Sequence, residues 1–182
     1  RGAVMGTSFM RPPTPDELNR MKSLVARAMH DGALGLSTGL IYIPGKYART
    51  EELIELARVA ATDGGIYASH IRDENEGLIA SLDEVFRIGR EAHVPVQISH
   101  LKLSGNLIQP QTAATVTNLQ QLRRSGLAAQ VEAALSTARA SGLQVTQDHY
   151  VYSAVTMPAE QLLPADIAAL PVKFVAPLAV DR

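Results

Sequence analysis

The fold of this chain is decided by two short stretches, "YASHIRD" (Tyr67–Asp73) and "VQISHLK" (Val96–Lys102). Each stretch is an apolar run that ends in Ser-His, and a cationic residue follows two positions after the histidine. The two histidines, His70 and His100, stand thirty residues apart, which is the length of one β-α-β repeat. The pattern therefore predicts two neighbouring parallel strands that end in the same way.

Helices and strands alternate outward from this pair. Two helix starts carry capping signals: Thr14, with Pro15 next to it and Glu17 three residues later, and Thr50. Helix is expected over 14–32, 50–65, 81–93 and 119–142, the last with a break at Ser125-Gly126. Strand is expected over 33–38, which reads as buried, and over 66–71, 94–101, 143–154 and 172–177.

This alternation predicts an α/β fold in which helices cover a parallel sheet. An open doubly wound sheet and a (β/α)8 barrel compete, but the Gly-rich phosphate turn that usually marks the first is absent from the sequence. Polar residues instead gather at the carboxyl ends of successive strands, which is where a barrel builds its site. They are Thr38, Ser69, His70, Arg72, Asp73, Ser99, His100, Lys102, Asp148, Tyr150 and Tyr152. We therefore expect one domain over residues 1–182 that forms part of a TIM-type barrel.

Composition excludes several classes of function. The chain has 182 residues, a net charge of −1 and an aromatic content of 4% without tryptophan, so no nucleic-acid partner is expected. The absence of cysteine excludes disulfides and thiolate metal ligands within these residues. No apolar run approaches the roughly 18 residues of a membrane span, and no signal peptide is visible. We therefore expect no membrane association and a cytoplasmic location.

The paired histidines predict a metal site. Neighbouring parallel strands lie ~4.8 Å apart, so His70 and His100 can converge on one ion if they occupy equivalent positions. Neutral imidazoles suit Zn²⁺, which activates water and polarises a carbonyl. A lone histidine at a strand end is more often a structural polar residue than a ligand, but two in matching contexts favour a ligand pair. Two histidines leave the site incomplete, because catalytic zinc normally has three protein ligands.

A family resemblance extends from residue 1 to about residue 157. It is carried by the motifs "GLSTGL", "YASHIRDE" and "VQISHLK", in that order, followed by "VTQDHYVYSA". With these motifs the chain resembles the N-acyl-D-amino-acid deacylases of the amidohydrolase superfamily. The resemblance implies a zinc-dependent hydrolase barrel with one or two divalent ions. Such an enzyme cleaves the amide bond of a small-molecule N-acyl-D-amino acid, giving a D-amino acid and a carboxylate.

The resemblance also implies roles for individual residues. His70 and His100 are similar to the family's zinc ligands, and Lys102 to a lysine that contacts the substrate carboxylate. Tyr150 is similar to a substrate-contacting tyrosine, and a hydroxyl a few positions later, on Thr156 or Ser153, is also expected to contact substrate. Weaker candidates for lining the site are Arg72, Asp73, Asp148 and Tyr152. For Arg72 and Asp73 we favour a structural role, such as pairing with each other at a helix entrance.

Several parts of the family's site are expected to lie outside this chain. The family's H-x-H pair and metal-binding cysteine would precede Arg1, and its catalytic aspartate would follow Arg182, so the catalytic residue is unknown and the chain is expected to be a central piece of the enzyme. Two alternatives remain. One is a dihydroorotase- or hydantoinase-like amidohydrolase, mildly disfavoured because no lysine ends a strand before His70. The other is a catalytically incomplete fragment, whose open sheet edges predict self-association.

Overall fold

The structure is a computed structural model that describes residues 1–102 and 126–149. All of these residues belong to one compact unit, Arg1–Val151. The prediction of a single domain over the whole chain stays a prediction. The expected strand at 172–177, the helical residues 119–125 and the end of the strand predicted over 143–154 lie outside the described residues.

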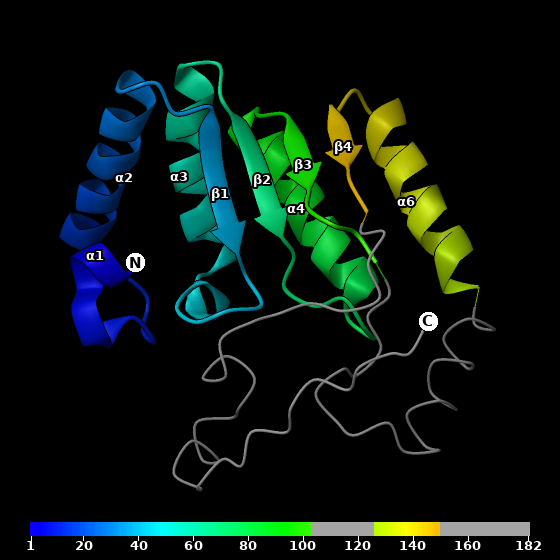
Figure 1. The fold of residues 1–182 in the computed structure, drawn as a ribbon, viewed down its shortest axis with the longest axis horizontal. Coiled ribbons are helices and arrows are strands. Elements are labelled where there is room, and N and C mark those ends of the chain that lie inside the picture. Colours follow the sequence, from blue (N-terminus) through cyan, green and yellow to red (C-terminus); the bar gives the residue numbers. More distant parts are fainter. Residues whose placement is uncertain (103–125, 150–182) are drawn as a thin grey trace, which may run out of the picture. The chain divides into compact units, whose positions relative to one another are not determined.

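The described residues form a four-stranded parallel sheet, as predicted. Its strands are β1 (Gly35–Gly39), β2 (Ile66–His70), β3 (Val96–Ile98) and β4 (Val145–Gln147). Their order in space, β1-β2-β3-β4, is their order in the chain (Figure 1). A doubly wound sheet reverses its strand order at a switch point, whereas a barrel adds each strand beside the last. The described sheet shows no reversal, which favours the barrel reading.

Helices connect and cover the strands. The connecting helices are α3 (Thr50–Thr62), α4 (Leu78–Ala92) and α6 (Leu127–Ala140), and α2 (Pro15–His30) precedes β1. Short helical turns complete the described part: α1 (Gly2–Met5), η1 (Gly6–Ser8) and η2 (Gly45–Tyr47). Helices α3 and α4 pack on each other and against the same face of the sheet (Figure 1). Because the four strands are parallel, their carboxyl ends lie at one edge of the sheet, where the polar residues are expected.

One of the two predicted helix caps is confirmed and the other is wrong. Thr14 caps α2: its hydroxyl accepts from the Glu17 backbone N–H at 3.3 Å, and the Glu17 carboxylate accepts from the Thr14 N–H at 2.7 Å. Helix α3 begins at Thr50 itself, with Arg49 as its N-cap residue. The Thr50 hydroxyl instead donates to Glu84 on α4 at 2.8 Å. A tertiary contact has thus replaced the local cap.

Two predicted strand properties need correction. The first strand was expected to be buried, but β1 is half-buried with Ser37 exposed, and one of its edges has no partner strand within the described ranges. The third strand is shorter than 94–101. Its start is delayed because the Val94 N–H bonds the carbonyl of Gly89, in α4. Its end comes before His100, which has a left-handed φ of 41°.

The core lies between the sheet and its helices. Tyr67 and Ile98 from the strands pack with Leu82, Val85 and Ile88 from α4, and all five are essentially inaccessible to solvent. The Tyr67 hydroxyl bonds Thr38 Oγ1 on β1 at 2.8 Å, and its burial raises the pKa of the phenol. This core holds β2 and β3 in place, so the residues that follow these strands are attached to a rigid part of the structure. No helix in the described part of the chain is long and apolar enough to cross a membrane.

Gly35 gives a direct test of the β1–β2 pairing. A Cβ at Gly35 would lie 2.1 Å from the carbonyl oxygen of Ile66, and the φ of 159° at Gly35 is one that side chains rarely adopt. Overpacking alone costs roughly 1–3 kcal/mol, and this clash is with backbone, which cannot rotate away. We expect Gly35→Ala to lower the free energy of unfolding by about 3 kcal/mol in urea denaturation. Gly2→Ala, whose Cβ would meet nothing within 4 Å, is the control, and equal losses in both variants would contradict the structure.

Candidate metal centre

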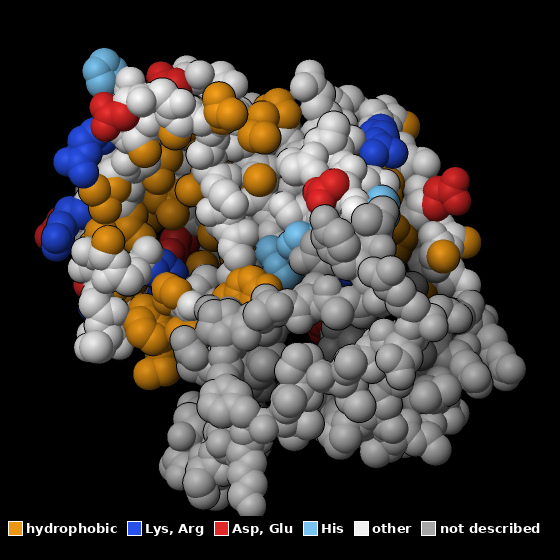
Figure 2. Space-filling view, viewed as in Figure 1, with side chains coloured by type: hydrophobic (Ala, Val, Ile, Leu, Met, Phe, Trp, Pro, Cys, Tyr) orange, Lys and Arg blue, Asp and Glu red, His pale blue; other side chains and the backbone are white. Residues whose placement is uncertain are grey.

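His70 and His100 come together, but by a different route from the one expected. The strand register pairs Ser69 with Ile98, so His70 lies level with Ser99 and not with His100. A one-residue offset would normally turn the second side chain to the opposite face. The left-handed backbone of His100 ends the strand and returns its ring to the site. The two ring centroids are 4.2 Å apart, and histidines gather near the middle of the face in Figure 2.

Left-handed backbone is uncommon for a residue other than glycine and costs of order 1–3 kcal/mol. Such strain is found where the surrounding structure holds a functional group in place. Leu101, next to His100, is buried, and its N–H donates to the carbonyl of Asp148 at 2.9 Å. These contacts anchor the chain just after the strained residue.

Glu74 is the third member of the cluster, and the sequence reading did not assign it. Its Oε1 lies 3.3 Å from Nε2 of His70 and 3.4 Å from Nδ1 of His100. The three side chains offer ligand atoms that all lie within 4.8 Å of one another. The Glu74 side chain is only 4% exposed. Two imidazoles and one carboxylate are a ligand set that zinc uses in proteins.

Lys102 also reaches the cluster. Its Nζ donates to the Glu74 carboxylate at 2.7 Å and lies 3.2 Å from Nδ1 of His100. Lys102 and His100 therefore lie on the same side of the chain. Strand alternation does not bring it there, because β3 ends at Ile98. The Glu74 carboxylate lies against both the ammonium and the histidines, and it offsets the repulsion expected between a lysine and a bound cation.

The environment of His70 suits a metal ligand. Burial lowers the pKa of His70 to about 4, and the neighbouring His100 and Lys102 act in the same direction while Glu74 opposes them. The ring is therefore neutral at pH 7, as a ligand must be. Its Nε2 is buried and makes no hydrogen bond with any of the described residues. A buried nitrogen without a hydrogen bond is costly, and an ion between His70, Glu74 and His100 would satisfy it.

The chain is similar to known proteins. A D-aminoacylase of Alcaligenes xylosoxydans xylosoxydans is 50% identical over 105 residues, which are 58% of this chain and 22% of that enzyme. An N-acyl-D-glutamate deacylase of the same organism is 39% identical over 115 residues, covering 63% of this chain and 24% of that enzyme. The chain is homologous to the D-aminoacylases. It spans about a quarter of the length of these curated relatives, and no protein-family profile matches it.

Solved structures have a similar fold over most of this chain. A D-aminoacylase described as having a binuclear metal centre superposes with a TM-score of 0.65 at 40% identity, over 82% of this chain and 28% of that chain. An N-acyl-D-glutamate deacylase from Bordetella bronchiseptica, complexed with zinc and a phosphonate inhibitor that mimics the tetrahedral intermediate, gives 0.63 at 34% identity over the same shares. These similarities agree with the resemblance to D-aminoacylases and with the barrel class predicted from the motifs.

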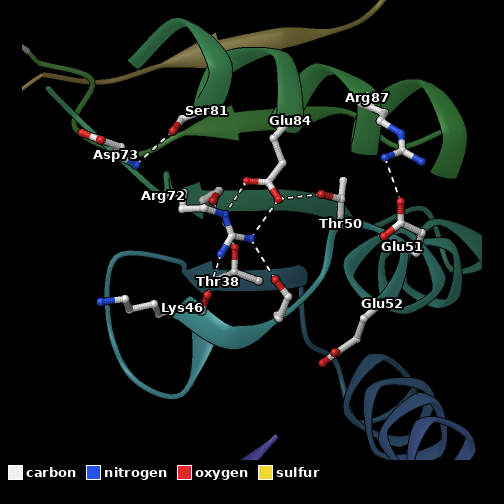
Figure 3. Close-up of polar contacts among 12 residues, drawn as sticks. Thr38, Lys46, Thr50, Glu51, Glu52, Arg72, Asp73, Ser81, Glu84 and Arg87 are labelled. Atoms are coloured by element: carbon white, nitrogen blue, oxygen red, sulfur yellow. Dashed lines mark hydrogen bonds and ion pairs between the residues drawn. The ribbon is translucent and has the colours of Figure 1, made fainter. Parts of the chain in front are cut away.

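Two weaker candidates have structural contacts in this D-aminoacylase homologue. Arg72 does not pair with Asp73: its guanidinium makes a bidentate pair with Glu84 of α4, at 2.8 and 2.9 Å (Figure 3). That pairing raises the pKa of Arg72. The backbone N–H of Asp73 bonds Ser81 Oγ at 2.9 Å, and its carboxylate accepts from the Asn75 N–H at 2.6 Å. Neither side chain belongs to the His-Glu-His group.

The remaining candidates are not part of the cluster or lie outside the described residues. Asp148 is exposed, accepts from Gln97 at 2.7 Å and is not part of the His-Glu-His group. Four predicted residues lie outside the described ranges, and their roles stay predictions; they are Tyr150, Tyr152, Ser153 and Thr156. The missed Glu74 did carry a signal in the sequence. It is a carboxylate four residues after His70 within the quoted motif "YASHIRDE", but nothing local showed that it returns to the histidine.

Proposed function

We propose that the protein carrying this chain hydrolyses the amide bond of N-acyl-D-amino acids with the help of zinc. The observation that carries the proposal is the group of half-buried His70, buried Glu74 and half-buried His100 at the carboxyl ends of β2 and β3, in a homologue of D-aminoacylases. His70 and His100 would hold the metal, and Glu74 is the third donor that this chain offers. A bound zinc would supply an activated water and polarise the amide carbonyl.

Glu74 links the metal position to the substrate position in this proposal. Its carboxylate lies against both histidines and also accepts from Lys102, so it fixes where the ammonium lies. The Lys102 side chain keeps 24% of its surface exposed, so part of it can meet a carboxylate that arrives from solvent. An N-acyl amino acid supplies that carboxylate. Lys102 would therefore bind the carboxylate of the substrate, while the amide carbonyl of the substrate faces the histidines.

The activity is tested by assaying the purified protein on matched substrates. We expect hydrolysis of N-acetyl-D-amino acids, little of their L enantiomers, and loss of activity after chelation with recovery on adding zinc. Hydrolysis of cyclic amides in place of the linear ones would favour a dihydroorotase- or hydantoinase-like reaction. Absence of both activities from a protein that holds zinc would overturn the proposed reaction but not the metal site.

Lys102→Ala should weaken catalysis selectively. Its loss should raise KM and cost roughly 1.5–3 kcal/mol of transition-state binding, the range for a hydrogen bond to a charged group. Zinc content should not fall, because Lys102 donates no ligand atom. The effect should largely disappear for a substrate whose carboxylate is amidated, since that substrate never used the ammonium. Lys46→Ala, which removes an exposed lysine, is the matched control. Equal losses on the acid and its amide would show that Lys102 has another role.

A further inference from the structure

The loop between β1 and α3 lies directly against His70. The Leu40 N–H donates to the His70 carbonyl at 2.9 Å, and the Tyr42 ring meets the His70 ring edge-on with centroids 4.8 Å apart. The loop is folded tightly on itself, since a Cβ at Gly45 would lie 2.4 Å from the Gly39 carbonyl oxygen. The loop Gly39–Arg49 therefore lies against one side of the candidate ligand His70.

Arg72 holds the far end of this loop. Besides its pair with Glu84, its guanidinium donates to the carbonyl of Lys46 at 2.7 Å and to the carbonyl of Ala48 at 3.0 Å. Figure 3 shows the guanidinium lying between the loop and α4. Glu84 also accepts from Thr50 at the start of α3, so three segments meet at this ion pair. A guanidinium fork can bind carboxylate and carbonyls at once, whereas an ammonium cannot reproduce that geometry.

A short chain of bonds leads from Arg72 to the site. Arg72 holds the Lys46 carbonyl, and the Lys46 N–H in turn donates to the Tyr42 carbonyl at 2.7 Å. Tyr42 packs on His70, which stands only two residues before Arg72 in the chain. The segment that carries His70 therefore also carries Arg72, the residue that holds the loop against His70.

We propose that Arg72 is a positioning residue, which holds the loop Gly39–Arg49 so that Tyr42 stays packed against His70. Its importance for catalysis rests on the proposed function, but its effect on the loop does not. Arg72 touches neither the candidate ligand atoms nor the substrate position in this account. It acts through the backbone of the loop.

Limited proteolysis tests the proposal, because the loop contains two trypsin sites, after Lys46 and after Arg49. Cleavage of a native protein follows the population of the locally opened form. In Arg72→Met we expect cleavage at these two sites to rise about tenfold or more, and Arg72→Lys to show most of the same rise. Arg87→Met is the matched control, since Arg87, on α4, also forms ion pairs, with Glu51 and Glu91, and contacts no loop residue in the bonds described. The control should change loop cleavage less than twofold.

The site after Arg58, within α3, reports whether the whole protein has loosened. Unchanged loop cleavage in both Arg72 variants would overturn the proposal. An equal rise at Arg58 in both would also overturn it, because Arg72 would then be a residue of general stability. A second readout addresses positioning: the His70 ring signal in NMR spectra should move in Arg72→Lys and in Tyr42→Leu, and the double variant should add little to Tyr42→Leu. Additive shifts would show that Arg72 does not act through Tyr42.

Discussion

His70→Ala and His100→Ala should each remove tightly bound zinc from the protein. Each substitution deletes one imidazole from a group of three candidate ligands, and the two residues left should not hold the ion tightly at a tetrahedral site. Removing an outer-shell partner of a metal ligand costs about 10–100-fold in affinity or activity, so loss of a ligand itself should exceed 100-fold. The measurement is zinc content after dialysis, read beside the initial rate of deacylation.

His30→Ala provides the control for this prediction. His30 is exposed in the last turn of α2 and is not one of the three grouped residues, so its loss should leave zinc content and rate unchanged. Circular dichroism should show that both site variants remain folded, because the core between the sheet and α4 is untouched. Full zinc in either His70→Ala or His100→Ala would exclude that histidine as a ligand.

Glu74→Gln should weaken zinc binding and also destabilise the fold. The amide keeps the shape of the side chain but removes the charge that faces Lys102 and both histidines. Breaking one partner of a buried ion pair costs about 3–5 kcal/mol, and the lower end is expected here because Lys102 is partly exposed. We expect a loss of about 3 kcal/mol in the free energy of unfolding without metal. Zinc affinity should fall at least tenfold in a competition titration with a chelator.

Glu76→Gln is a close control, because Glu76 belongs to the same loop but is exposed. It should change neither stability nor zinc affinity by a measurable amount. A Glu74→Gln protein that keeps wild-type zinc affinity would restrict Glu74 to holding Lys102. If the Glu74→Gln protein also keeps wild-type stability, the close contacts of Glu74 contribute neither to zinc affinity nor to the free energy of unfolding.

The sequence predicted the fold well where the signals are local. Thr14 and Glu17 are three residues apart, so their capping box could be found by inspection. Thr50 also stands at the start of a helical pattern, but its hydroxyl donates to Glu84, thirty-four residues away, and no residue near Thr50 in the sequence indicates that contact. The β3 boundary was missed for a related reason. The left-handed backbone of His100 depends on the tertiary contacts around it and not on its residue type.

The sequence predicted that His70 and His100 can lie close together, and they do, although the geometric reason for it was imperfect. Matching motifs suggested that His70 and His100 lie level on adjacent strands, whereas the register is offset by one and His100 compensates through its backbone. Glu74 was missed because the position of a loop residue in the sequence does not show which way its side chain points. Its carboxylate turns back to the histidines within a loop held by the Asp73–Ser81 and Asn75–Asp73 bonds, which only the three-dimensional structure shows.

One metal ion is expected to lie between the ends of β2 and β3, at His70, Glu74 and His100. The most direct measurement is an anomalous difference map from crystals of the zinc-loaded protein, recorded on both sides of the zinc absorption edge. The account predicts a peak about 2.0–2.1 Å from a ring nitrogen of His70 and of His100, with a Glu74 oxygen beside it. A peak bound elsewhere, or no peak at these histidines in saturating zinc, would contradict it.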